Sequence, residues 1–490
     1  MKNHLRAMAW LLVVTMLSGG LLSCGDTPSE TTAAVTTDPA AVEESTETEL
    51  KDAVPELDFG GETFTISTTN YFPDEMDVLE LTGEITNDAI YNRNQRMEER
   101  FNVVIEDIEI NNPNHTEHPA HLRSSILSND GAFDMAGVFV YYAGSLVLEN
   151  LFQNWSGIPY ADLEMPWWIR NINDAFTVDG KLYTAVSDLC ISSMQSTYVY
   201  LFNQKLASDY AIEDLYTVVD EGRWTLDYLY DLTSGIYQDV NGDGTAGPED
   251  VYGYLSDLVT SLDGYYATSG QPILAVTDSG LEVQMNSERA MGIFEKVSRL
   301  MHESAGTFRI YHGKNGQTYD SKYPLFMENH GLVMPVRMTA LFKELRDMEV
   351  DFGILPYPKY DEEQKQHYTY LLDNYSVLCI PNGDVNVEMV GALAEAMAAD
   401  SQKYVMPVFY ESALQGKYTR DQRSVEMLDL IMAGRTFDIS ILYSHALGDM
   451  PYFLRNAIMN GKTYASSYAA SEQKYLTSAK QLYEKLKAMP

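Results

Sequence analysis

The sequence predicts an α/β protein whose folded part divides into more than one lobe. Short runs of β-branched and aromatic residues alternate with stretches of helical periodicity along most of the chain. The part of the 490-residue chain that follows residue 54 is longer than one hydrophobic core normally supports. No internal repeat with a period of 20–50 residues is visible, which excludes a solenoid or a propeller.

The first five elements alternate between strand and helix. They are a strand at 63–67, a helix that Asn87 or Asp88 can cap and that ends near Arg100, a strand at 103–108, a helix at 119–128 and a strand at 133–140. This order implies a right-handed parallel sheet. Further strands are expected at 197–202, 351–356 and 375–380, and further helices at 287–302, 387–399 and 471–487.

The N-terminus is typical of an exported lipoprotein. Lys2 and Arg6 precede an apolar stretch over 7–22 that is too short for a spanning helix. It ends in Leu-Leu-Ser-Cys, which resembles the bacterial lipobox and implies cleavage after residue 23 and lipid on Cys24. The alternative is a plain secretory signal with an incidental cysteine. Residues 24–54 contain no aromatic side chain and are rich in Thr, Ser, Glu, Ala and Pro, so a disordered tether is expected there.

Charge and cysteine content limit the class of partner. The formal net charge of −38 argues against binding to nucleic acid or to anionic lipid through a basic face. Cys190 and Cys379 each lie in an apolar run, which favours two buried thiols. A disulfide between them remains possible in an exported protein.

Several stretches, taken in order, resemble the extracellular solute-binding proteins of ABC-type importers, in the group that binds sugars and oligosaccharides. They are DGKLYTA at 179–185, YVYLFNQ at 198–204, RWTLD at 223–227, HGLVM at 330–334, DFGILPYP at 351–358 and YVMPVFYE at 404–411. The resemblance implies a two-lobed periplasmic-binding-protein-like fold with crossing hinge segments near 186–196, 366–376 and 400–415. It also implies a monomer that is not an enzyme, holds a small solute between its lobes and delivers it to membrane permease subunits. The expected lobes are 55–190 plus 376–405 and 195–370 plus 412–490.

One segment has the pattern of a calcium loop. Asp239, Asn241 and Asp243 offer oxygen ligands at positions 1, 3 and 5 of a twelve-residue loop, and a glycine follows at position 6. Thr245 would add its backbone carbonyl and Asp250 would occupy position 12. We expect one structural Ca²⁺ here. The alternative is a turn rich in Asn and Gly that binds no metal.

Two other functional classes remain open. His115, His118 and His121 lie close together in the sequence and are the basis for a metal-capture hypothesis, although an exposed helix start is the simpler interpretation. A lipid-anchored glycan hydrolase would need a pair of carboxylates, whose separation in space the sequence does not reveal. Neither a nucleophile elbow nor a His-Glu-x-x-His motif supports hydrolysis.

The chain contains 34 Tyr and 17 Phe, an excess that suits a saccharide, because aromatic rings pack on the C–H faces of sugars. Ligands of open α/β sheets bind beyond the carboxyl ends of strands. That places Asn70, Tyr71, Tyr141 and Tyr142 among the candidates. The family resemblance adds Tyr265, Tyr266, Arg337, Asp373 and Asn374.

Overall fold

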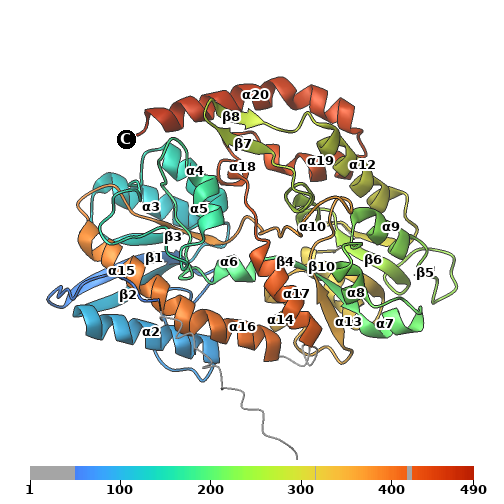
Figure 1. Ribbon diagram of the computed structural model, residues 1–490, viewed down its shortest axis with the longest axis horizontal. Coiled ribbons are helices and arrows are strands. Elements are labelled where there is room, and N and C mark those ends of the chain that lie inside the picture. Colours follow the sequence, from blue (N-terminus) through green and yellow to red (C-terminus); the bar gives the residue numbers. More distant parts are fainter. Residues whose placement is uncertain (1–49, 315, 416–421) are drawn as a thin grey trace, which may run out of the picture. The chain divides into compact units, whose positions relative to one another are not determined.

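Two β-sheets organise the chain, as the computed structural model shows (Figure 1). The structure describes residues 50–314, 316–415 and 422–490, with the side chains of 412–415 left out. The predicted signal segment, Cys24 and the tether as far as residue 49 lie outside the described residues. Residues Lys51–Pro490 form one compact unit. The predicted α/β class is confirmed.

The first sheet, with the helices around it, is called the first lobe. Its strands are β1 (Glu62–Thr69), β2 (Val103–Ile110), β3 (Met135–Phe139) and β12 (Ser376–Cys379), in the order β12-β3-β1-β2. Its helices are α2 (Ile85–Phe101), α3 (Glu117–Ser128), α4 (Val140–Leu148), α5 (Arg170–Phe176) and α15 (Val387–Asp400). β1 runs parallel to β2 and β3, as predicted, and β12 pairs with β3 in the antiparallel sense because it arrives from the other lobe.

The second sheet and its helices form the second lobe. Its strands are β4 (Tyr198–Asn203), β5 (Tyr237–Gln238), β6 (Val251–Asp257), β9 (Thr307–Ile310), β10 (Gly331–Arg337) and β11 (Phe352–Leu355). Its helices are α7 (Gln204–Asp209), α8 (Leu215–Asp220), α9 (Leu226–Ser234), α10 (Thr260–Asp263), α11 (Tyr265–Thr268), α12 (Glu288–His302), α13 (Lys322–Met327), α14 (Thr339–Phe342) and α17 (Gln422–Ala433). β6, β9 and β10 are mutually parallel, whereas β4, β5 and β11 pair in the antiparallel sense, so this sheet is mixed rather than parallel.

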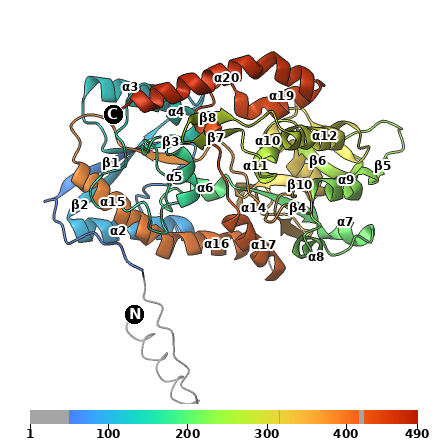
Figure 2. The same ribbon diagram turned by 45° about the horizontal axis from the view of Figure 1, so that its top comes forward.

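Two extended segments cross between the lobes side by side. After the short helix α6 (Ser192–Gln195), the chain enters β4, and the return crossing lies against it: the Tyr198 amide donates to Tyr370 at 2.9 Å and the Leu372 amide to Ser196 at 3.0 Å. A third connection follows α15 through a π-helical turn at Ser401–Val405 into α16 (Met406–Gln415), along the lower side of both lobes in Figure 2. These crossings lie at the three places where the family resemblance puts hinges.

The C-terminal part contacts both lobes rather than the second lobe alone. It contains α18 (Ile439–Leu442), α19 (Phe453–Met459) and the long helix α20 (Tyr464–Ala488), which packs on the hairpin of β7 (Leu274–Thr277) and β8 (Gly280–Val283). At the far end of α20, the Lys181 ammonium of the first lobe donates to the carbonyl of Lys487 at 3.1 Å. Figure 1 shows α20 above both sheets. The expected assignment of 412–490 to one lobe therefore does not describe this segment.

Local sequence signals set most element boundaries. Ser287 caps α12, and its side chain accepts from the Ala290 amide. Glu84, not Asn87 or Asp88, caps α2, so that helix begins earlier than predicted. Packing also begins before residue 55, because Val54 is buried and Asp52 forms an ion pair with Arg100 at 2.7 Å. The predicted tether is thus too long at its C-terminal end.

Cys190 and Cys379 are both buried free thiols. Burial raises the pKa of each well above its ordinary value, so neither is a reactive thiolate at neutral pH. The structure therefore agrees with two buried thiols and not with a disulfide between them. Among the residues that the structure describes, every helix is too short or too polar to cross a bilayer.

Candidate functional site: a cavity between the two sheets

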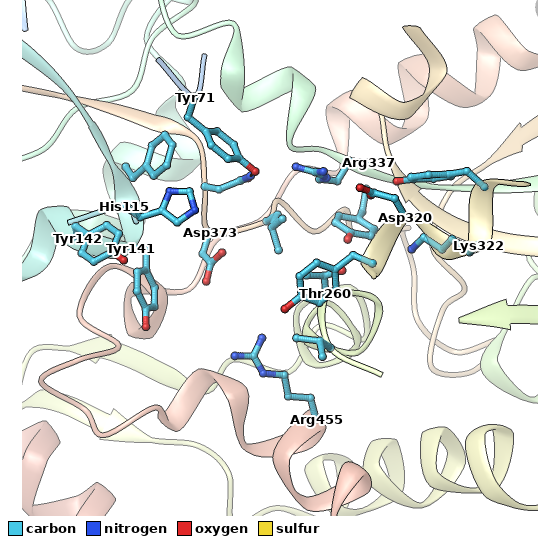
Figure 3. A pocket seen from close by; sticks show the side chains of 17 residues that line it. Tyr71, His115, Tyr141, Tyr142, Thr260, Asp320, Lys322, Arg337, Asp373 and Arg455 are labelled. Carbon is cyan, nitrogen blue, oxygen red and sulfur yellow. The ribbon is translucent and has the colours of Figure 1, made fainter. Parts of the chain in front are cut away.

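A cavity of about 390 Å³ lies between the two sheets (Figure 3). Its lining combines rings with charged and amide side chains. The lining residues are Tyr71, His115, Phe139, Tyr141, Tyr142, Tyr198, Val259, Thr260, Tyr319, Asp320, Lys322, Tyr323, Arg337, Leu372, Asp373, Asn374 and Arg455. Both lobes, the return crossing and α19 contribute to it, so it belongs to no single lobe.

The first lobe supplies an aromatic wall. Tyr71 follows β1, and its ring meets Phe139, the last residue of β3, edge-on at 5.0 Å between centroids. His115, which follows β2, packs on Tyr71 at 5.3 Å. Tyr141 and Tyr142 begin α4 and contact each other at 4.9 Å, nearly perpendicular. Three parallel strands thus end at this wall, as expected for an open α/β sheet.

The second lobe supplies most of the charged groups. Thr260 follows β6, Arg337 ends β10, and Lys322 begins α13. Lys322 and Asp257 form a buried ion pair at 2.8 Å, with side chains 2% and 0% exposed. Burial alone would raise the pKa of Asp257, but the Lys322 charge and the hydrogen bonds from Lys322 and Ser261 outweigh it and lower that pKa to about 2.

The return crossing links the two walls. Asn374 accepts a hydrogen bond from the Ser196 hydroxyl at 2.8 Å and donates to the Tyr71 hydroxyl at 3.3 Å. Its neighbour Asp373 points into the cavity and accepts a hydrogen bond from the Tyr452 hydroxyl. Burial raises the pKa of Asp373, although that bond and the nearby Arg455 charge oppose the rise.

Arg455 belongs to a second ion pair at the edge of the cavity. Its guanidinium lies 2.6 Å from Asp263 and 4.0 Å from the centre of the Tyr452 ring. Burial raises the pKa of Asp263 well above its ordinary value in spite of Arg455, and the second carboxyl oxygen has no hydrogen-bond partner within the described chain. The hydrogen-bonding capacity of the buried Asp263 carboxyl is therefore only partly used.

The structure brings most of the sequence-predicted ligand residues together, but not all of them. Tyr71, Tyr141, Tyr142, Arg337, Asp373 and Asn374 all line the cavity. Asn70 does not, because its side chain joins the ends of β1 and β2: it donates to Asn111 at 2.9 Å and accepts from the Asn112 amide at 3.0 Å.

Tyr265 and Tyr266, which were expected to contact the ligand, do not line the cavity either. Both are core residues, 0% and 1% exposed. The Tyr265 hydroxyl bonds to those of Tyr200 and Tyr254 at 2.7 and 2.8 Å, so its polar end is satisfied inside the second lobe. A tyrosine pair in a short apolar helix gives no sequence sign of which way it faces.

Sequence reasoning missed part of the lining. Thr260 and His115 lie in the segments that follow β6 and β2, so the rule that located Tyr71 also points to them. Tyr319, Lys322 and Arg455 carry no such signal, because the loop after β9 and the helix α19 reach the cavity only through tertiary packing.

The excess of aromatic residues divides between core and cavity. Trp155, Trp167, Trp168 and Trp224 are at most 1% exposed, and none of them lines the cavity. Six tyrosines do line it. Beside Phe139 and His115, the rings available to a ligand are therefore phenols, which add a hydroxyl donor to each apolar face.

The predicted calcium loop is an exposed turn closed by its own hydrogen bonds. Asp239 accepts from the amides of Gly242 at 2.7 Å and Gly244 at 2.8 Å, and Asp243 accepts from Thr245 at 2.7 Å. Asn241 donates to Asp243 at 3.1 Å.

Asp250 has a different environment from the rest of that loop. It is 0% exposed, and its two oxygens accept from the amides of Val240 and Gly247, both at 3.0 Å. Within the described residues, no group of three His, Cys, Asp or Glu side chains is arranged to hold a metal ion. A calcium loop also takes ligands from Asn side chains and backbone carbonyls, so the calcium loop stays a prediction.

The three clustered histidines have separate environments. His115 packs on the aromatic wall, whereas the His118 ring lies 3.2 Å from the Ser67 hydroxyl in the core. Burial lowers the pKa of His118 to about 3. His121 lies against Phe133. Among the described residues, these three histidines do not form a group that could hold a metal ion.

Comparison with protein-family models gives no match, and comparison with curated proteins gives none either. Solved structures do match. An ABC substrate-binding protein from Listeria monocytogenes, in complex with cycloalternan, is 11% identical over 87% of this chain and 99% of its own, with a TM-score of 0.54. The fold is that of the ABC solute-binding proteins.

Two further structures share this solute-binding-protein fold. A solute-binding protein from Thermotoga lettingae, bound with α-D-tagatose, is 14% identical over 87% of this chain and 100% of its own, with a TM-score of 0.53. The GacH receptor of Streptomyces glaucescens, described in complex with acarbose, is 12% identical over 86% and 99%, with a TM-score of 0.54. Both neighbours are named for ligand binding, one as a solute-binding protein and the other as a receptor. The two-lobed architecture expected from the resemblance is confirmed.

Proposed function

We propose that this protein is a lipid-anchored extracellular receptor that captures a small saccharide between its two lobes and delivers it to an ABC permease. The observation that carries the proposal is the cavity itself. Strand ends of both sheets and the return crossing meet around a space of about 390 Å³, lined by six tyrosines and by polar side chains. Rings for the C–H faces and polar groups for the hydroxyl rim are what saccharide binding requires.

The position of the cavity supports capture by closure of the lobes. Tyr71 belongs to the first lobe, Arg337 to the second, and Asn374 to the crossing between them. A ligand that contacts all three makes more contacts when the lobes are close together, so it stabilises the closed arrangement. No covalent step is needed.

Anchoring and delivery rest on the sequence and on the fold. The basic start, the apolar stretch and Cys24 support export and lipid attachment at the outer face of the cytoplasmic membrane. The neighbours with this fold are named as ABC substrate-binding proteins, which supports permease subunits as the partner. A monomer is sufficient, because one chain supplies both walls of the cavity.

Isothermal titration calorimetry with a panel of mono- and oligosaccharides tests the proposal. At least one should bind, and Tyr141→Ala should weaken that binding about tenfold, because it removes one aromatic face of the cavity. Tyr210→Ala is the matched control, since Tyr210 is 37% exposed and lies outside the cavity. Absence of binding to every saccharide, or release of reducing ends on incubation, would contradict the proposal.

A further inference from the structure

Arg337 differs from the other cations of the cavity in having no carboxylate partner. Lys322 is paired with Asp257 at 2.8 Å, and Arg455 is paired with Asp263 at 2.6 Å. Within the described chain, the Arg337 guanidinium forms no ion pair. Asp320 is the other acid on this side of the cavity. It is exposed at the rim and is not within ion-pair distance of Arg337.

The surroundings of Arg337 are phenolic. Its guanidinium points across the cavity toward the Tyr71 hydroxyl, with Asp320 and Lys322 on the far side (Figure 3). Burial opposes the charge, but the oxygens of Tyr198, Tyr71 and Tyr323 outweigh it and raise the pKa of Arg337 above its ordinary value. The side chain is therefore a permanent, largely enclosed positive charge.

Hydrogen-bond donors converge beside this charge. The Tyr71 oxygen already accepts from the Asn374 amide at 3.3 Å, so its own proton is left for an acceptor. No described acceptor takes that proton. The planar fork of Arg337 and the Tyr71 hydroxyl thus offer several donors to one small region of the cavity.

We propose that the ligand is an acidic saccharide whose carboxylate binds Arg337 and the Tyr71 hydroxyl. The inference rests on the proposed function, since it specifies the chemical class of the captured sugar. Closure of the lobes around a neutral ligand would enclose an unpaired guanidinium, which is costly, whereas a carboxylate neutralises it. A single carboxylate suits the site better than a polyanion, because Asp373 and Asp320 also face the cavity and the chain carries a net charge of −38.

Calorimetry with matched ligands tests this directly. Glucuronic and galacturonic acids and their disaccharides are titrated beside the corresponding neutral sugars, the uronate methyl esters and glucose 6-phosphate. At least one uronate should bind about 10- to 100-fold more tightly than its neutral counterpart and its ester, the range expected for a charge-assisted hydrogen bond to arginine. Tighter binding of the phosphate than of the uronates would overturn the choice of carboxylate.

Variants identify the side chain responsible. Arg337→Gln should remove the preference for the uronate while the neutral sugar changes little, and Arg337→Lys should retain part of it, because the charge remains and the fork is lost. Arg346→Gln removes the same charge from an exposed position outside the cavity and should leave both affinities unchanged. Equal losses for both ligands in Arg337→Gln would show that Arg337 binds hydroxyls, and would overturn the inference.

The outcomes also separate this inference from the function on which it rests. Binding of neutral sugars without any uronate preference refutes the acidic-saccharide inference and leaves the saccharide receptor standing. Absence of binding for the whole panel refutes both.

Discussion

Replacing Lys322 by Met should lower the stability of the folded protein. Lys322 is enclosed, 2% exposed, and its ammonium donates to Asp257 at 2.8 Å and to the Ser261 hydroxyl at 3.1 Å. Asp257 in turn accepts from the amides of Val259 at 3.0 Å and Ser261 at 3.1 Å. The substitution keeps an apolar stem but leaves a buried carboxylate without its counter-charge.

The size of the effect follows from the pKa of Asp257. A pKa lowered from 3.8 to about 2 corresponds to roughly 2.5 kcal/mol of stability at neutral pH. Breaking a buried pair by removal of one partner costs about 3–5 kcal/mol in general, because the remaining charge stays desolvated. We therefore expect Lys322→Met to lower the free energy of unfolding by about 3 kcal/mol or more, within that range.

Urea denaturation followed by circular dichroism measures this loss, and its dependence on pH provides a second test. Because folding lowers the pKa of Asp257, its contribution is present above about pH 4 and disappears as the pH falls toward 2. The difference between wild type and Lys322→Met should therefore shrink over that window. Lys343→Met, at an exposed lysine, is the control. A loss below about 1 kcal/mol at neutral pH, or a difference independent of pH, would refute the reasoning.

Three further predictions concern other parts of the chain. Glu395→Ala should destabilise the first lobe by more than about 2 kcal/mol, as measured by urea denaturation. The buried indoles of Trp167 and Trp168 donate to Glu395 at 2.9 and 2.7 Å and would lose their acceptor. Millimolar Ca²⁺ should raise the melting temperature through the Asp239–Asp250 loop, and Asp243→Ala should remove this increase; an unchanged melting temperature in wild type would contradict a calcium site. Cys24→Ala should move the protein from the membrane fraction to the medium, whereas continued membrane retention would contradict the lipid anchor.

The sequence was most informative where one segment determines its own structure. Four predicted elements lie within a few residues of the observed ones. They are the strands at 63–67 (β1) and 103–108 (β2) and the helices at 287–302 (α12) and 387–399 (α15). Periodicity and capping are local, so they can be read from the sequence. The direction of β4 is not local: it depends on where the crossing delivers the chain, so periodicity does not reveal that the second sheet is mixed.

The residues of the candidate site show the same difference between local and non-local signals. Tyr71 and Tyr141 were predicted from their positions after strands, and both line the cavity. Tyr265 was added by the family resemblance, and it is buried because the hydroxyls of Tyr200, Tyr254 and Tyr265 bond to one another inside the second lobe. Whether a side chain faces the core or the cavity depends on partners in space that are often distant in sequence. Arg455, for example, reaches the cavity from α19.

The paired crossings restrict how the lobes can move. Backbone hydrogen bonds join Tyr198 to Tyr370 and Leu372 to Ser196, so the two strands resist bending at that level. Asn374 lies just beyond this pairing, where it ties Ser196 to Tyr71 through its side chain. If the lobes rotate, the backbone angles therefore have to change on either side of the paired stretch and at the π-helical turn Ser401–Val405. A π-helical turn within a helix often marks a functional position. Under the proposed function, a ligand held by Tyr71 and Arg337 would act on both sides of that stretch at once, and this would couple binding in the cavity to the angle between the lobes.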